Sequence, residues 1–245
     1  MDHFIAASDY HGSHRDAAAE SAFFSAVSVI DPRNKHKRLM LGDLFNLAAL
    51  RKGADEDDRR NALCEDIGLG LAFLEKFKPT VLLLGNHDQR LYDAVSSQGM
   101  GKSGPMSELC ASYVEDLKRV CKALKCVILP YDKRKGVYKI GSLSFAHGFG
   151  HGSKLCENMA SAYGDCVFGH GHKIVRNTVM RGRPVTGYQI GTLAQKDMHY
   201  VRSDLSALRQ QHGFAYGVVD GRRHTVLTPE IVDGKVCFAT VFWHK

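Results

Sequence analysis

Residues 81–88 have the sequence VLLLGNHD, in which four apolar residues run directly into a polar block, Gly85 to Asp88. A short apolar run bounded by a turn residue such as Gly85 is typical of a buried strand. In α/β sheets, the loops at the carboxyl ends of the strands form the functional crevice. We therefore expect the polar side chains of this block to face such a crevice.

The same arrangement recurs at four other places in the chain. FIAAS precedes Asp9-Tyr10-His11, LML precedes Gly42-Asp43, LSFA precedes His147-Gly148, and CVF precedes Gly169-His170-Gly171-His172. Polar groups from distant parts of the sequence should therefore converge on one edge. They offer carboxylates, an amide oxygen and several imidazoles, a mixture that suits divalent transition metals better than Ca²⁺ or Mg²⁺.

Two of the blocks place potential ligands at alternate positions. Asp9 and His11 are separated by one residue, as are His170 and His172. Alternate residues of an extended segment share a face, so each pair should point in one direction. Two such pairs with a shared carboxylate could hold two ions about 3.5–4 Å apart, the separation used in two-metal hydrolysis.

The first half of the chain alternates apolar runs with helical patterns. Residues 3–8, 38–41 and 81–84 are expected to be strands, with helices at 15–30 and from Asp55 onward. This alternation predicts a parallel sheet with right-handed crossovers.

The second half has a different pattern. We expect a loop at about 92–104, a helix at 106–124 and a strand at 126–130. From Lys133 onward the sequence is rich in strand patterns, with a helix at 153–163 between two of them. The predicted fold class is α/β, as one domain of two sheets in a sandwich flanked by helices. Residues 1–245 form that domain, with a variable helical insert at about 91–124 and a β-rich part after about residue 193.

Composition narrows the class of protein. The chain has 245 residues, 44% of them hydrophobic, and no apolar run approaches the roughly 20 residues that cross a bilayer. The N-terminal residues lack the basic and long apolar regions of a secretory signal, so we expect a cytoplasmic protein without a membrane partner. Seven cysteines without a CxxC pair predict reduced thiols rather than disulfides or a thiolate zinc site. A net charge of +7 and a pI of about 9.0 favour phosphate-rich partners.

In this order, the blocks DxH, GD, GNHD, H and GHxH resemble the calcineurin-like metallophosphoesterase superfamily. All five are present without a substitution, and they span Asp9 to His172. More loosely, the runs GDLFNLAALRKG and GNHDQRL resemble small metallophosphoesterases of phages and bacteria. The helix-flanked two-sheet sandwich named above is the fold that this resemblance implies.

The resemblance also implies a role for each matching residue. The first metal would be bound by Asp9, His11 and His172, the second by Asn86, His147 and His170, and Asp43 would bridge the two. His87 would face the substrate as the catalytic acid, and Asp88 would orient His87. The cofactors would be two divalent ions, for which we expect Mn²⁺, with Fe, Zn, Ni and Co as alternatives.

The expected activity is hydrolysis of phosphate esters by a metal-bridging hydroxide, with His87 as general acid. The basic pI favours a phosphodiester, in nucleic acid or a nucleotide. A phosphomonoesterase and a non-catalytic nucleic-acid-binding protein are the alternatives. The sequence shows no groove of aromatic and basic residues for a single strand, and it leaves the oligomeric state open.

Residues near the blocks supply candidate substrate contacts. Arg90, His14 and Arg15 lie where a phosphate could be reached. In the block around His147, the nearby His151 is the competing ligand candidate. His147 is preferred because it directly follows an apolar strand and precedes a glycine.

Overall fold

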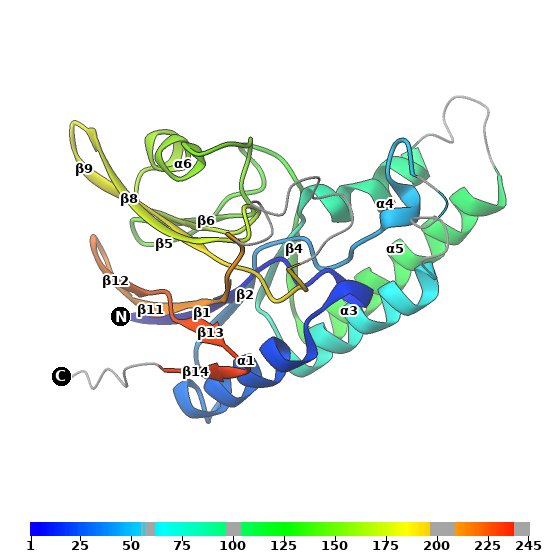
Figure 1. Cartoon of the computed structure of the whole chain (residues 1–245), viewed down its shortest axis with the longest axis horizontal. Helices are drawn as coiled ribbons and strands as arrows, with labels where there is room; N and C mark the ends of the chain where they lie inside the picture. The colour runs from blue at the N-terminus through cyan, green and yellow to red at the C-terminus, as the bar shows by residue number, and fades with distance from the viewer. Residues whose placement is uncertain (55, 57–61, 97–103, 197–208, 238–245) are drawn as a thin grey trace.

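The computed structural model describes residues 1–54, 56, 62–96, 104–196 and 209–237. Two sheets pack face to face, with helices covering their outer surfaces (Figure 1). The predicted single-domain sandwich of two sheets flanked by helices is therefore confirmed. In the part of the chain that is described, no helix is long and apolar enough to cross a membrane.

The first sheet has six strands in the order β12-β11-β1-β2-β3-β4. Their bounds are β1 Asp2–Ala7, β2 Lys37–Met40, β3 Val81–Leu83, β4 Val127–Leu129, β11 Ala215–Asp220 and β12 Arg223–Leu227. Strands β1 to β4 are parallel to one another, as the alternation of strands and helices predicted, whereas β11 and β12 are antiparallel to their neighbours. The carboxyl ends of β1, β2 and β3 therefore meet at one edge.

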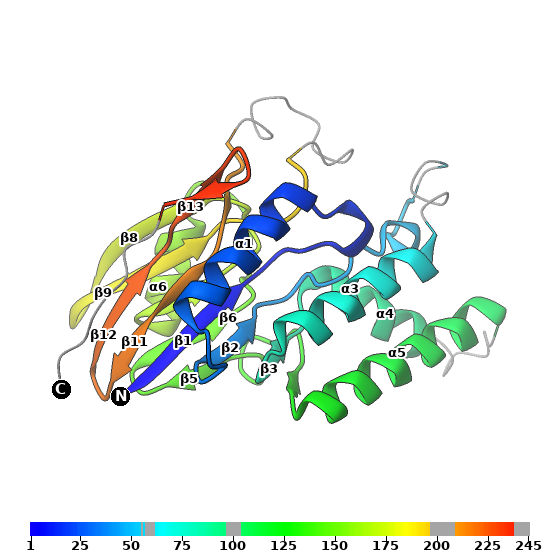
Figure 2. The same cartoon turned by 90° about the horizontal axis from the view of Figure 1, so that it is seen from below.

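Helices cover the outer face of this sheet (Figure 2). Their bounds are α1 Ala17–Ile30, α3 Leu63–Phe77, α4 Asn86–Ser96 and α5 Pro105–Leu124. The Asp16 side chain caps α1 by accepting the N–H of Ala19 at 2.8 Å, which satisfies one of the free amides of the first turn. Two short 3-10 helices, η1 Gly12–His14 and η2 Ala48–Leu50, follow the ends of β1 and β2.

The second sheet has the order β5-β6-β7-β9-β8 and carries α6 on its outer face (Figure 1). The bounds are β5 Tyr138–Ile140, β6 Leu143–Ala146, α6 Leu155–Tyr163, β7 Cys166–Phe168, β8 Ile174–Arg181 and β9 Arg183–Ile190. A small third sheet is formed by β10 His212–Gly213, β13 Glu230–Val232 and β14 Lys235–Val236. Because β6 and β7 are parallel, their carboxyl ends also meet at one edge.

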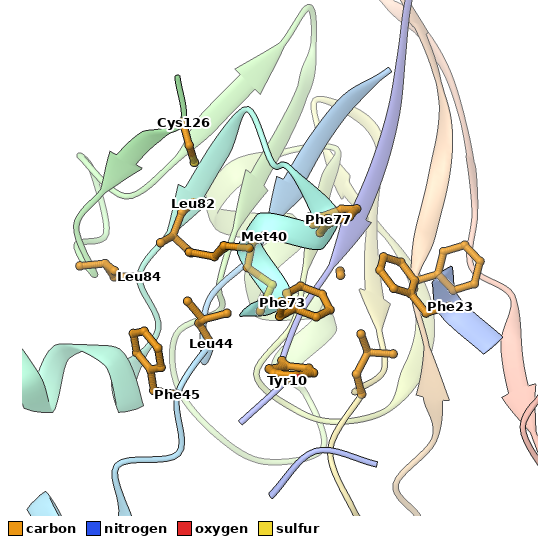
Figure 3. Packing of buried hydrophobic residues seen from close by; sticks show 14 of the residues in the cluster. Tyr10, Phe23, Met40, Leu44, Phe45, Phe73, Phe77, Leu82, Leu84 and Cys126 are labelled. Atoms are coloured by element: carbon orange, nitrogen blue, oxygen red, sulfur yellow. The ribbon is translucent and has the colours of Figure 1, made fainter. Parts of the chain in front are cut away.

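The core follows the alternation of side chains along the strands. In β1, Phe4 and Ala6 pack between the two sheets, whereas Ile5 and Ala7 pack under the helices. Both faces of the strand are therefore buried, which explains its unbroken apolar sequence. On the helical side, Tyr10, Phe23, Met40, Phe73 and Phe77 are among the residues that fill the space between sheet and helices (Figure 3).

Some sequence-based boundaries were wrong. Residues 92–96, expected in a loop, continue α4, which begins at Asn86 inside the GNHD block. The helix expected from Asp55 is described from Leu63 as α3, while residues 55 and 57–61 lie outside the described residues. Among the strand patterns at the end of the chain, we expected a strand at 235–243; Lys235–Val236 form β14, and residues 238–243 lie outside the described residues.

The turn between α1 and β2 holds a buried ion pair. Asp31 Oδ2 lies 2.9 Å from Arg38 Nη2, and Asp31 Oδ1 accepts the N–H of Lys35 at 2.7 Å. Burial alone would raise the pKa of Asp31, but hydrogen bonds from Lys35, His36 and Arg38 outweigh it and hold the pKa below its ordinary value. Since the pKa is depressed on folding, ionised Asp31 stabilises the fold above about pH 4, and this is lost as the pH falls through the lower folded pKa.

We expect Asp31→Asn to lower the free energy of unfolding by about 3 kcal/mol at neutral pH, because it leaves the buried Arg38 without its partner. The difference in the free energy of unfolding between the variant and wild type should become smaller as the pH falls below about 4. Urea denaturation at several pH values measures both effects. Asp2→Asn is the matched control, since Asp2 pairs with Lys37 at an exposed position and should contribute less than about 1 kcal/mol. Equal losses in the two variants would contradict this account of Asp31.

Candidate metal centre

The five polar blocks meet at one place, at the carboxyl ends of β1, β2, β3, β6 and β7. Three overlapping groups there could hold a metal ion: Asp9, His11 and His172; His11, Asp43 and His87; and Asp43, His147 and His170. Asn86 joins the third group, because its Oδ1 lies 3.0 Å from His147 Nε2 and 2.9 Å from His170 Nδ1. All seven ligands named from the sequence are thus brought together, although their binding of metal stays a prediction.

Backbone hydrogen bonds fasten the first two blocks to each other. The N–H groups of Asp9 and His11 donate to the carbonyls of Gly42 and Asp43, each at 3.0 Å. A Cβ at Gly85 would overlap the carboxylate of Asp43, and a Cβ at Gly169 would overlap the side chains of Ser8 and Asp9. Glycine is therefore required where the third and fifth blocks approach the first two.

The backbone at the ligands differs from the sequence-based expectation. Asp9, His11, Asp43, His170 and His172 all have positive φ angles, between 50° and 67°. The Asp-x-His and His-x-His pairs thus reach the site through left-handed turns, and the prediction of extended segments was wrong. Such a conformation is uncommon for residues other than glycine, and such strained positions cluster at functional sites.

Asp43 lies between the two outer groups. Its Oδ2 is 3.4 Å from His147 Nε2, 3.8 Å from His11 Nε2 and 4.0 Å from His87 Nε2. Its Oδ1 accepts the N–H of His87 at 2.9 Å, which fixes the carboxylate. This is the place that a carboxylate shared by two ions would occupy.

Two histidines have their tautomers set by the backbone. His147 Nδ1 donates to Leu41 O at 2.8 Å, and His170 Nε2 donates to Gly150 O at 2.9 Å. When these rings are neutral, the opposite nitrogens carry lone pairs, and these nitrogens lie 3.2 Å apart. Facing lone pairs beside the Asn86 oxygen repel one another unless a cation lies between them. The donor set therefore fits a metal ion.

The first group has the same character. His11 Nε2 and His172 Nε2 are 3.2 Å apart, and His172 Nε2 is also 3.2 Å from Asp9 Oδ1. Asp9 and His11 are fully buried, and His172 is 7% exposed. Burying a carboxylate and two imidazoles away from solvent costs free energy unless a positive charge compensates the carboxylate.

The pKa values reflect the crowding of charges. Burial lowers the pKa of His147, but the charge and hydrogen bond of Asp43 reverse this and raise it to about 9. Burial and then the neighbouring His147 lower the pKa of His170 to about 4. One buried positive charge is therefore favoured in this group and a second is disfavoured, as expected where a cation and the protons compete for the same nitrogens.

His87 is oriented by a backbone carbonyl. Its Nδ1 lies 2.7 Å from Asn46 O, so Nδ1 is the protonated nitrogen of the neutral ring and Nε2 faces the metal centre. The sequence assigned the orienting role to Asp88. Asp88 instead accepts the backbone N–H groups of Gly85 at 2.8 Å, Phe45 at 3.0 Å and Leu44 at 3.3 Å. It thus joins the loops after β2 and β3, and the contact that fixes His87 Nδ1 is made by Asn46.

Asp66 supports the same loop and was missed in the sequence. It is 2% exposed, and its carboxylate accepts the N–H groups of Ser13 at 2.9 Å, Asn46 at 3.1 Å and Leu47 at 2.7 Å. Through Asn46, this carboxylate on α3 positions the carbonyl that orients His87. A signal was present, because Asp66 shares its helical face with Gly70 and Phe73, both buried.

An open cavity of about 360 Å³ gives access to the centre. It is lined by Asp43, Asn86, His87, Arg90, His151, His170, Gly171, His172, Lys173 and Gln210. Arg90 is the one sequence-predicted substrate contact among them; its Nη1 donates to Asn46 O at 3.0 Å. Arg15 pairs with Glu20 at 3.0 Å instead, and neither it nor His14 is among the described lining residues. Lys173 and Gln210 were not anticipated.

Comparison with known proteins gives distant likenesses only. No family model and no curated protein matches the chain. Among solved structures, wild-type Vps29 of Entamoeba histolytica complexed with Zn²⁺ has a TM-score of 0.48 at 14% identity, covering 96% of both chains. Vps29 of Chaetomium thermophilum has a TM-score of 0.47 at 10% identity, covering 95% of this chain and 92% of that one. A novel archaeal phosphodiesterase has a TM-score of 0.42 at 12% identity, covering 92% and 98%.

Because their TM-scores are below 0.5, these likenesses carry no argument about the site. The function of the site is therefore inferred from the geometry of this chain alone. The two-sheet architecture and the three groups of potential ligands both agree with the sequence-based expectation. The two-sheet fold and the clustering of the potential metal ligands, both implied by the resemblance in sequence, are therefore confirmed.

Proposed function

We propose that the chain is a metal-dependent phosphoesterase that hydrolyses phosphodiesters of nucleic acid or nucleotides. One observation carries this proposal. Imidazole nitrogens converge in two groups on either side of the Asp43 carboxylate, and in one of these groups backbone carbonyls fix the tautomers of His147 and His170. Asp9, His11 and His172 would hold one ion, Asn86, His147 and His170 a second, and Asp43 both.

Divalent ions bound there would supply Lewis-acid activation of water and neutralisation of phosphoryl charge. Mn²⁺ suits the mixed nitrogen and oxygen ligands, as would Fe, Zn, Ni or Co. The chain itself supplies the binding surface for the ester. Arg90 and Lys173 line the cavity from α4 and from the loop after β7, and Asp43 is the one acidic residue among its described lining residues. An anionic substrate is therefore favoured.

His87 is the residue that we assign as the acid. Burial lowers its pKa to about 4, with Asp43 raising the value and Arg90 lowering it, so the free protein holds a neutral ring at pH 7. An anionic ester in the cavity adds negative charge near Nε2 and raises the pKa. His87 Nε2 then gains the proton that it donates to the departing oxygen.

The test is hydrolysis of model esters by protein stripped with chelator and reloaded with Mn²⁺. We expect bis(p-nitrophenyl) phosphate to be hydrolysed with a higher kcat/KM than p-nitrophenyl phosphate, and reloading to restore activity lost on stripping. A preference for the monoester would contradict the diester proposal and support a phosphomonoesterase. Hydrolysis of neither ester by metal-loaded protein would contradict the proposed activity.

A further inference from the structure

A second cavity, of about 390 Å³, lies beside the metal centre. It is lined by Tyr131, Asp132, Lys133, Arg134, Phe149 and Gly150. Two aromatic residues and two exposed cationic residues thus line one space. Sequence position did not indicate this combination, because the two rings are 18 positions apart and come from different loops.

The two cavities adjoin through a short segment of chain. Gly150 lines the second cavity, and the next residue, His151, lines the cavity over the metal centre. The Gly150 carbonyl accepts the hydrogen bond from His170 Nε2, and the Tyr131 ring centroid lies 5.8 Å from that of His147. A ligand that leaves the metal centre past His151 therefore meets the aromatic pair next.

Both rings are held in place. Tyr131 and Phe149 stack with centroids 5.1 Å apart and planes inclined by 25°, and the Tyr131 hydroxyl donates to Gly148 O at 3.3 Å. Tyr163 packs on Phe149 from α6, with centroids 6.1 Å apart. Both rings of the pair are half-buried, so contacts support them while part of each stays accessible. A platform fixed before binding loses little conformational entropy when a flat ring stacks on it.

The charges of the second cavity favour an anion. Lys133 and Arg134 are exposed, and in the described part of the chain neither lies within ion-pair distance of an acidic group, although the charge of Asp132 attracts Arg134. The carboxylate of Asp132 accepts the N–H groups of Arg134 at 2.8 Å and Lys135 at 2.7 Å, so backbone amides offset its charge. An aromatic surface beside exposed cations is the combination that binds a base together with its phosphate.

We propose that this second cavity is a nucleotide subsite, in which a base packs against the accessible parts of the Phe149 and Tyr131 rings and the adjoining phosphate contacts Lys133 and Arg134. The proposal deepens the proposed function and rests on it for the identity of the bond that is cleaved. The ligand is a nucleotidyl unit on one side of the ester at the metal centre. A dinucleotide and a longer single strand share this chemistry.

The test is binding to metal-free protein in chelator, so that it does not depend on catalysis. Isothermal titration calorimetry measures the affinity of the dinucleotide pTpT and of a (dT)10 strand at several salt concentrations. The first variant is Phe149→Leu, which keeps an apolar side chain against Tyr163 but removes the stacking face. The second is the pair Lys133→Ser and Arg134→Ser. Thermal denaturation confirms that each variant is folded.

We expect Phe149→Leu to weaken the binding of both ligands about tenfold and to leave the salt dependence unchanged. The double variant should weaken (dT)10 binding and make the slope of log K against log salt shallower by about 1.4, for two lost phosphate contacts on a single strand. The matched control is Arg33→Ser with Lys35→Ser, which removes two exposed cations in the turn before β2, at the opposite end of the strand from the metal centre. It should change neither quantity.

Each outcome either supports or overturns the proposed nucleotide subsite. Binding of pTpT that depends on Phe149 supports a site for one nucleotidyl unit, and additional affinity for (dT)10 shows that a strand continues beyond it. Absence of binding by wild-type protein, or equal affinity in wild type and both variants, overturns the subsite. Hydrolysis of methyl p-nitrophenyl phosphate by Mn²⁺-loaded wild type tests the proposed function separately, because that ester has no base.

Discussion

His87→Ala is expected to lower kcat for a phosphodiester by about 10²–10⁴-fold while leaving the metal content unchanged. The ring of His87 is 5% exposed, its Nδ1 is fixed by Asn46 O, and its Nε2 faces the centre 4.0 Å from Asp43 Oδ2. Removing the ring would delete the group that we propose as the proton donor to the leaving oxygen. The measurements are steady-state kinetics and metal analysis of the same preparation.

The leaving group separates proton donation from positioning. A p-nitrophenolate leaving group is a stable anion and needs little protonation, whereas an alkoxide leaving group needs a proton in the transition state. If His87 is the acid, the loss in His87→Ala should be larger for an ester with an alkoxide leaving group. An equal loss for both esters would show that His87 positions the substrate instead.

Metal content tests the competing role for this residue. His87 belongs to one of the three groups that could hold an ion, together with His11 and Asp43. If His87→Ala lost metal in proportion to its loss of activity, His87 would be a ligand and the assignment as acid would be wrong.

The seven candidate ligands could be found from the sequence because five blocks, each just after an apolar run, resemble the motifs of calcineurin-like metallophosphoesterases. An apolar run such as VLLL fixes where β3 ends, and parallel strands bring their carboxyl ends together, so linear position predicts spatial convergence. The backbone conformation could not be predicted in the same way. Asp9 and His11 occur in left-handed turns because hydrogen bonds to Gly42 and Asp43, on another strand, hold them there.

The supporting contacts were harder to predict for a different reason. His87 is oriented by the backbone carbonyl of Asn46. Every residue type has such a carbonyl, so the amino-acid sequence does not reveal this contact. Tyr131 and Phe149 stack only after β4 and β6 are placed, and neither residue belongs to a motif. The second cavity could therefore be recognised only in the tertiary structure, whereas the sequence blocks indicated where the first would lie.

The variant Asp43→Ala should bind neither ion at concentrations that saturate wild type, so the metal content should fall from about two ions per chain to near zero. Asp43 Oδ2 faces both His11 and His147, and no other described carboxylate belongs to more than one of the three groups. Its loss would remove a ligand from both proposed ions and also the charge that would offset their mutual repulsion.

Asp9→Asn provides the contrast, since Asp9 belongs only to the group with His11 and His172. We expect this variant to keep about one ion per chain, held by Asn86, His147 and His170 with Asp43. The matched control is Asp165→Asn, another buried carboxylate, which pairs with Arg183 and belongs to none of the three groups. Its metal content should equal that of wild type.

Thermal denaturation gives a second readout for Asp43 that does not require activity. Ions that bind only the folded protein raise Tm in proportion to the logarithm of their concentration. Wild type should therefore show a Tm that increases with Mn²⁺, and Asp43→Ala should show none of this increase. If Asp43→Ala retained two ions and the full metal-dependent rise in Tm, Asp43 would not be shared, and the two groups of ligands would have to act as separate sites.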